Sequence, residues 1–188
     1  MTKTVLGTCG YCGSGQDTIA DDLCKVLGFV KISLGDFIRA EAIKSGLTLT
    51  RTNLQNVRLM LDQAKGRDYV PRKLVRQVLL SKYERIIFTG IRRMEEYNIF
   101  HSVFDMKLVF VYVDKDIRYQ RMLLRKETKD ASTIEQLDQQ MMRELQLFDY
   151  GQLKEVCDYI FDFNMPLKEY QEHKIFILEQ LLKNTFVE

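Results

Sequence analysis

The chain has 188 residues, apolar and charged fractions of 46% and 29%, and a formal net charge of only +2. This length predicts one domain with a substantial core, and the balanced charge gives no indication of a nucleic-acid-binding surface. No apolar run approaches the roughly 18–20 residues of a membrane span, and the strand-like start leaves no room for a signal peptide. We expect a cytoplasmic protein with small-molecule substrates, no nucleic acid and no membrane; the sequence carries no signal for its oligomeric state.

A glycine-rich segment follows the first apolar run of the chain. The run Thr4-Val5-Leu6 predicts a strand, residues 19–27 have a helical pattern, and residues 10–18 between them read GYCGSGQDT. A strand, a glycine-rich turn and a helix in this order direct backbone N–H groups at a polyphosphate. We therefore predict a phosphate-binding loop for a nucleotide cofactor, ATP, formed by Gly10, Gly13, Ser14, Gly15, Gln16, Asp17 and Thr18.

Two residues of this loop depart from the P-loop pattern. The pattern has lysine where Gln16 stands, and usually serine or threonine where Asp17 stands. An amide dipole therefore replaces a positive charge on the β- and γ-phosphates, and Asp17 adds a negative charge beside them. Asp17 and Thr18 are the candidate Mg²⁺ ligands, because Mg²⁺ prefers hard oxygen donors. The loop predicts the fold and leaves open whether phosphoryl transfer is retained.

The cysteines allow an alternative interpretation of the same turn. Cys9 and Cys12 form a C-x-x-C at a strand-to-helix junction, where a redox pair also occurs. The glycines after Cys12 predict a wide loop where a redox pair needs a firm first helical turn, so we favour the phosphate loop. His101 and His173 are isolated in the sequence, which argues against zinc. Four cysteines without a secretion signal indicate a reducing compartment.

The rest of the chain alternates strand and helix patterns. Further strands are expected at 30–33, 85–90, 107–113 and 159–161, and helices at 35–46, at 53–64, from Pro71 and from Pro166. The strands at 85–90 and 107–113 are apolar almost throughout, which is typical of a parallel sheet covered on both faces. The pattern predicts an α/β fold: a three-layer, doubly wound, five-stranded parallel sheet with its ligand site at the carboxyl ends of the strands.

Four segments at that end of the sheet resemble the adenylate-kinase-type nucleoside monophosphate kinases of the P-loop superfamily. They are the loop itself, ISLGDFIRAE at 32–41, TGIRR at 89–93 and VDKDIRYQRMLLR at 113–125. Residues 90–97 are nearer to the phage-type deoxynucleotide kinases, and the closing residues 156–170 are similar to those of dephospho-coenzyme A kinases. The resemblance spans nearly the whole chain, although no single motif is intact.

The resemblance implies roles for residues in two of these segments. Asp36 and Arg39 match the Asp-x-x-Arg of the family's acceptor site, in which the arginine holds the acceptor's phosphate; the alternative is a solvated arginine on an amphipathic helix. Arg92 or Arg93 is expected to reach the transferred phosphoryl group, and the spacing does not choose between them. The family's strand-end aspartate, which helps to hold Mg²⁺ through water, is Thr89 here.

The fourth segment looks like the family's lid. Arg118, Arg121 and Arg125 share one helical face by their spacing. The resemblance implies that Arg121 and Arg125 close over the donor and stabilise transition-state charge. The alternative is a solvated stripe of arginines paired with Glu127, Asp130 or Glu144.

The predicted organisation is one P-loop kinase domain over residues 1–188. Its core comprises 1–34, 83–125 and 150–188, with a helical acceptor-binding insertion at about 35–82 and a lid at about 126–149. The predicted function is ATP-dependent transfer of a phosphoryl group to a nucleoside monophosphate or related acceptor. The alternatives are a non-catalytic nucleotide-binding protein, favoured by Gln16 and Thr89, and an enzyme like the dephospho-coenzyme A kinases.

Overall fold

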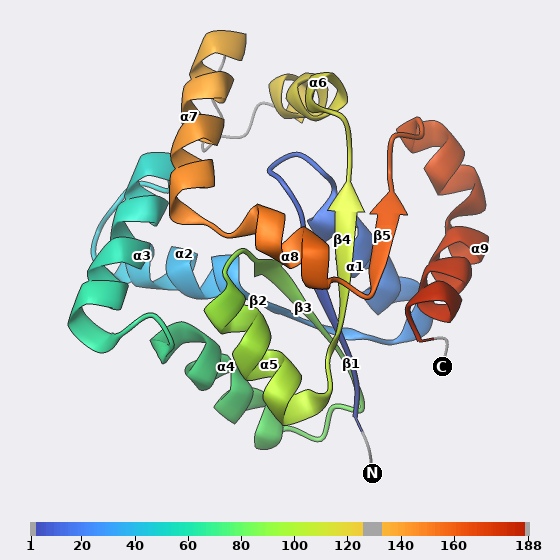
Figure 1. Cartoon of the computed structure of the whole chain (residues 1–188), viewed down its shortest axis with the longest axis horizontal. Coiled ribbons are helices and arrows are strands. Elements are labelled where there is room, and N and C mark those ends of the chain that lie inside the picture. Colours follow the sequence, from blue (N-terminus) through green and yellow to red (C-terminus); the bar gives the residue numbers. More distant parts are fainter. Residues whose placement is uncertain (1–2, 126–132, 187–188) are drawn as a thin grey trace.

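One parallel sheet organises the structure, a computed structural model that describes residues 3–125 and 133–186. Within these residues the sheet has five strands in the order β2-β3-β1-β4-β5, and every neighbouring pair is parallel (Figure 1). The strands are β1 (Thr4–Cys9), β2 (Val30–Ser33), β3 (Arg85–Ile91), β4 (Lys107–Tyr112) and β5 (Tyr159–Asp162). The expected five-stranded parallel sheet is confirmed.

The helices that the sequence predicts are present near their expected positions. The helices of the structure are α1 (Gln16–Leu27), α2 (Leu34–Lys44), α3 (Arg51–Lys65), α4 (Tyr69–Leu79), α5 (Met94–Phe104), α6 (Lys115–Arg125), α7 (Ile134–Leu147), α8 (Tyr150–Val156) and α9 (Leu167–Thr185). Of these, α5 and α8 are two that the sequence did not predict. Helix α3 begins two residues earlier than expected, because the Thr50 hydroxyl accepts a hydrogen bond from the Asn53 N–H at 3.2 Å and caps the helix. Helix α4 begins at Tyr69, with Pro71 in its first turn, where N–H groups have no helical partner in any case.

Helices cover both faces of the sheet, and the strands alternate their side chains between two cores. In β3, Ile86 and Phe88 pack into a core that includes buried residues of α2, α3, α4, α5 and α8. Ile87, which lies between them, packs into the other core with buried residues of α1 and α9. Figure 1 shows α9 and α5 on opposite sides of the sheet. This period of two on a buried strand produces the expected three layers.

The topology places the loop after β1 at the centre of the carboxyl edge. Strand β1 lies between β3 and β4, so β2 and β3 lie on one side of it in the sheet and β4 and β5 on the other. Ligands of open α/β sheets bind at this switch point, where the segments after neighbouring strands diverge. Among the described helices, none combines the length and apolar character needed to span a bilayer.

Candidate active site

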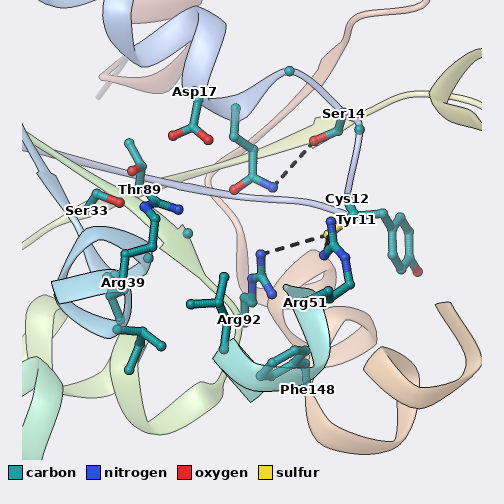
Figure 2. A pocket seen from close by; sticks show the side chains of 18 of the residues that line it. Tyr11, Cys12, Ser14, Asp17, Ser33, Arg39, Arg51, Thr89, Arg92 and Phe148 are labelled. Atoms are coloured by element: carbon teal, nitrogen blue, oxygen red, sulfur yellow. Dashed lines mark hydrogen bonds between the residues drawn. The ribbon is translucent and has the colours of Figure 1, made fainter. Parts of the chain in front are cut away.

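A pocket opens at this carboxyl edge and is lined by segments far apart in the sequence. Its walls come from the loop at 11–18, the start of α2, the first turns of α3, the end of β3, the end of α6 and the residue after α7 (Figure 2). The charged and aromatic side chains in the wall are Asp17, Arg39, Arg51, Arg58, Arg92, Arg125, Tyr11 and Phe148. Arginine is the prevailing charged residue, which suits the pocket to an anionic ligand.

The loop has the backbone geometry that a phosphate cradle requires. Gly10 has φ of 148°, and a Cβ on it would lie 2.5 Å from the Val111 carbonyl oxygen of β4. Gly15 has φ of 90°, and a Cβ there would lie 2.6 Å from the Phe163 ring. A side chain at either position would therefore meet both backbone strain and a clash. Helix α1 begins directly after Gly15, so the N–H groups of its first turn face the pocket wall.

Gln16 closes the loop on itself. Its Nε2 donates a hydrogen bond to the Gly10 carbonyl at 2.6 Å and a longer one to Ser14 Oγ at 3.4 Å. Gln16 stands at the sequence position of the P-loop lysine, and these hydrogen bonds hold the loop together without bringing a charge. Asp17 is exposed, and its carboxylate lies 3.9 Å from Lys31 Nζ. The loop's two unusual residues thus leave it without a cation of its own.

Thr89 places a hydroxyl at the bottom of the pocket. The residue is only 1% exposed, it lines the pocket at the end of β3, and its Oγ1 has no hydrogen-bond partner in the described part of the chain. Figure 2 shows it beside Ser33 on the wall opposite Arg51. A buried hydroxyl without a partner costs free energy, so Thr89 Oγ1 is available to a ligand oxygen or a metal-bound water that enters the pocket.

Asp36 and Arg39 lie together at the start of α2. The Arg39 guanidinium donates to the Asp36 carboxylate through Nη2, and through Nε at 3.1 Å. Arg39 also lines the pocket, with about a third of its side chain exposed. The contact with Asp36 is an exposed pair one helical turn apart, which a solvated arginine on an amphipathic helix also makes; the position of Arg39 in the pocket wall is what favours the acceptor role.

The structure separates Arg92 from Arg93, which the spacing did not. Both guanidinium carbons lie over the Phe148 ring, that of Arg92 at 5.1 Å and that of Arg93 at 5.6 Å from the ring centre, but only Arg92 lines the pocket. Arg93 is 3% exposed, does not line the pocket, and donates to Asp62 Oδ2 of α3 at 2.5 Å. A contact with a phosphoryl group in the pocket is therefore supported for Arg92, whereas the position of Arg93 suits the joining of β3 to α3.

The sequence analysis missed Arg51, which forms a buried cluster with Glu144 of α7. Arg51 Nη1 lies 2.6 Å from Glu144 Oε1 and 2.7 Å from the Cys12 sulfur of the loop. Glu144 also pairs with Arg92 at 3.5 Å and accepts a hydrogen bond from the Tyr150 hydroxyl at 3.1 Å. Of the acidic partners that the alternative gave to the lid arginines, Glu144 binds Arg51 and Arg92, and Glu127 and Asp130 lie outside the described residues. No local pattern marks this cluster, because its members come from five separate segments.

The cluster's charges stabilise one another. Burial alone would raise the pKa of Glu144, but the guanidinium groups of Arg92 and Arg51 outweigh it and lower this pKa to about 2. Burial opposes the charge of Arg92, yet Tyr150 and Glu144 keep its pKa above the usual value. Burial raises the pKa of the Cys12 thiol although Arg51 opposes the shift. At neutral pH the cluster therefore holds two cations, one anion and a neutral thiol.

The three arginines of α6 have different surroundings. Arg118 is buried and donates to the Cys12 and Val113 carbonyls, both at 3.1 Å, so it holds the loop in place. Arg121 Nη2 donates to the Phe163 and Met165 carbonyls at 2.9 and 3.1 Å. Arg125 lines the pocket. Within the lid predicted at about 126–149, α7 covers Ile134–Leu147, and residues 126–132 lie outside the described residues.

The cysteines are all free thiols in the structure. Cys9 is fully buried in the sheet and Cys12 belongs to the cluster with Arg51, so the geometry favours the phosphate loop over a redox pair. Among residues 3–125 and 133–186 no group of three or more histidine, cysteine or carboxylate side chains is placed to hold a metal ion. The hard oxygens near the loop, on Asp17 and Thr18, fit Mg²⁺ that is shared with nucleotide phosphates.

Comparison with known proteins places the chain in a family. Residues 6–143 match the family described as an AAA domain. A UPF0200 protein of Pyrobaculum aerophilum is 32% identical over 157 residues, which cover 83% of this chain and 85% of the relative. The chain belongs to the AAA-domain family and to the UPF0200 proteins. The UPF0200 protein of Thermococcus onnurineus is 29% identical over 178 residues, 92% of this chain and 95% of that one. The chain spans 59% of the length of a UPF0200/UPF0201 protein of Archaeoglobus fulgidus, to which it is 29% identical.

Solved structures with a similar fold include a shikimate kinase and a gluconokinase. Shikimate kinase from Bacteroides thetaiotaomicron superposes with a TM-score of 0.66 at 17% identity, covering 96% of this chain and 98% of that one. A gluconokinase from Sinorhizobium meliloti superposes with a TM-score of 0.55 at 16% identity, covering 97% and 94%. At such low identities the likeness shows the fold alone. This UPF0200 protein thus has a kinase-like P-loop fold, as the sequence predicted.

Proposed function

We propose that this UPF0200 protein is an ATP-dependent phosphotransferase whose acceptor is a nucleoside monophosphate or a related small molecule that carries a phosphate. The observation that carries the proposal is the convergence of arginines from four separate elements on one pocket with the phosphate loop. These arginines are Arg39, Arg51, Arg92 and Arg125. A protein that only bound a nucleotide would have little use for so many anion-binding groups beyond the loop.

The proposed roles follow from the position of each group around the pocket. The loop amides from Gly13 to Thr18 bind the donor's phosphates, and Asp17 and Thr18 supply oxygens for Mg²⁺. Arg39, on the acceptor side, binds the acceptor's phosphate through its planar guanidinium. Arg92, between the two sides, stabilises the charge of the transferred group. Positioning and electrostatic stabilisation are most of what phosphoryl transfer requires of a protein.

The proposed organisation is the one that the sequence suggested. The segment at about 35–82, with α2, α3 and α4, forms the acceptor side, and the segment at about 126–149 forms the lid. Arg121 and Arg125 lie at the base of that lid on α6. Closure of these segments over the pocket would exclude water and direct the phosphoryl group to the acceptor.

A second function, nucleotide binding without transfer, is favoured by two observations. Gln16 Nε2 donates to the Gly10 carbonyl at 2.6 Å, and Thr89 stands where the family has a strand-end carboxylate. Both changes fall on the side that binds the donor. In this case the arginines would bind the phosphates of a nucleotide, and the protein would respond to the bound nucleotide without transferring a phosphoryl group.

A coupled assay of ADP release separates the two functions. Wild-type protein is incubated with ATP, Mg²⁺ and each of a panel of nucleoside monophosphates, deoxynucleoside monophosphates and dephospho-coenzyme A, beside the Gln16→Lys variant. The proposal predicts turnover by wild type with at least one acceptor, and its loss in Arg92→Ala. Silence of the wild type with every acceptor, together with transfer by Gln16→Lys, would establish the non-catalytic alternative.

A further inference from the structure

The positive charge that the loop lacks has a candidate source in another element. A P-loop lysine is a point charge on the β- and γ-phosphates, and Gln16 offers only an amide. Arg51, the first residue of α3, reaches from the acceptor side of the pocket to the loop. Its Nη1 lies 2.7 Å from the sulfur of Cys12, within the loop itself, and it lines the same pocket (Figure 2).

Arg51 is held in this position from behind. The Thr50 hydroxyl caps α3 immediately before it, which fixes the backbone of Arg51 at the first helical position. Glu144, 1% exposed, binds the same Nη1 at 2.6 Å and does not line the pocket. An arginine whose side chain is 9% exposed and has a carboxylate behind it has lost most of its freedom, so it is pre-organised toward the cavity.

The guanidinium groups of the cluster stay charged. Glu144 is ionised, because the guanidinium groups of Arg92 and Arg51 lower its pKa to about 2, and burial raises the pKa of the Cys12 thiol, which stays neutral. Arg51 therefore brings a charged guanidinium to the pocket wall beside the loop, where its low solvent exposure lets a charge act strongly.

We propose that Arg51, positioned by Glu144, supplies to the donor phosphates the positive charge that Gln16 cannot supply. Arg51 is then a phosphate-binding residue that a different segment of the same chain brings to the loop, and Glu144 is a positioning residue. The inference rests on the proposed function in one respect, since it needs the loop to bind a polyphosphate. It requires no turnover, so it can fail while that function stands.

The inference is tested by a double-mutant cycle in which Arg51→Gln removes the charge and Gln16→Lys restores it at the usual place. ATP with Mg²⁺ is titrated calorimetrically into wild type, each single variant and the double variant. Loss of a charge-assisted contact predicts that Arg51→Gln weakens ATP binding by roughly 10–100-fold. Gln16→Lys should recover at least about 10-fold in the Arg51→Gln protein and gain less than about 3-fold in wild type, where Arg51 repels the new lysine.

Arg143→Gln is the matched control. Arg143 lies next to Glu144 on α7 and also joins α7 to α3, because its Nη2 donates to Asn56 Oδ1 at 3.0 Å. It does not line the pocket. Removing this arginine takes away the same charge from the same pair of helices, and ATP binding should change less than about 2-fold. If Arg51→Gln does not fold because Glu144 loses its nearest partner, Arg51→Gln combined with Glu144→Gln removes the pair together and takes its place in the cycle.

The outcomes are distinguishable. Equal gains from Gln16→Lys in the two backgrounds, or undiminished ATP binding by Arg51→Gln, would overturn the inference and leave the proposed function intact. A wild type that does not bind ATP would overturn both. If Arg143→Gln lost as much ATP affinity as Arg51→Gln, the loss would reflect the removal of any positive charge from these helices, and the specific role of Arg51 would be overturned.

Discussion

The glycine-rich loop and the arginine-bearing segments contribute different things to the pocket. The loop has shape without positive charge: glycines at positive φ and a glutamine bonded to the Gly10 carbonyl, near a buried threonine hydroxyl at the end of β3. The other segments have positive charge paired with carboxylates, with Arg39 on Asp36 and with Arg51 and Arg92 on Glu144. The difference teaches that a phosphate site can take its backbone cradle from one segment and its cations from others.

The two adjacent arginines after β3 provide the sharpest test of this division. Arg92→Gln should lower kcat/KM by roughly 100–1,000-fold, because it removes a preorganised donor at the transferred group. Arg93→Gln should act mainly on stability, since it leaves the buried Asp62 carboxylate with fewer partners. Steady-state kinetics and thermal unfolding of both variants check the contrast. A larger loss of kcat/KM in Arg93→Gln than in Arg92→Gln would reverse the assignment.

The charged side should also show in the pH dependence of stability. The pKa of Glu144 is about 2 in the folded protein, against the ordinary value of 4.5 for a glutamate in the unfolded chain, so folding stabilises the ionised form. The resulting contribution, roughly 3 kcal/mol, is complete above about pH 4.5 and is lost as the pH falls toward 2. Urea unfolding at pH 7 and at pH 3 should show the cost of Glu144→Gln shrinking at the lower pH. Glu135→Gln, an exposed change on the same helix, should cost little at either pH, and a constant cost for Glu144→Gln would contradict the account.

Substitution of Arg39 by lysine separates the acceptor from the donor. Lysine keeps the charge but loses the planar pair of donors, so the KM for the acceptor should rise about 10-fold, near 1.4 kcal/mol. The KM for ATP should stay within about 2-fold of the wild-type value. Initial-rate kinetics with one substrate varied at a time measures both constants. A rise confined to ATP would move Arg39 to the donor side.

Thr89 tests the uncharged side, with the smallest expected effect. Thr89→Val replaces a buried hydroxyl without a partner by a methyl group, so the free energy of unfolding should stay equal or rise by up to about 1 kcal/mol. Binding of ATP with Mg²⁺ should nevertheless weaken by a few-fold, because a ligand-facing oxygen is gone. Thermal unfolding with and without the nucleotide gives both quantities. A destabilised variant with unchanged ATP binding would show that the hydroxyl serves the fold alone.

Local patterns in the sequence were sufficient for the sheet and the loop. The strands at 85–90 and 107–113 have near-continuous apolar runs, which are typical of strands in the middle of a parallel sheet that is covered on both faces. The glycines from Gly10 to Gly15 showed the turn, because backbone at positive φ and close approaches require glycine. The three-layer fold followed from the alternation of these elements.

The arginine cluster was beyond the reach of such patterns. Arg51 and Glu144 are 93 residues apart, and each looks like an ordinary helical surface residue in its own segment. Arg92 and Arg93 differ in their surroundings because the backbone after β3 turns one side chain to the pocket and the next to Asp62. Such choices are made by tertiary packing, and a single sequence carries no local record of them.

The central claim is that the loop binds donor phosphates with cations that come from other elements. A crystal structure with ADP and Mg²⁺ tests it most directly. The account predicts the β-phosphate against the amides of Gly13 to Thr18, with the guanidinium groups of Arg51 and Arg92 within hydrogen-bond or ion-pair distance of the phosphate region. A nucleotide bound away from the loop, or bound there with both guanidinium groups turned from the phosphates, would contradict it.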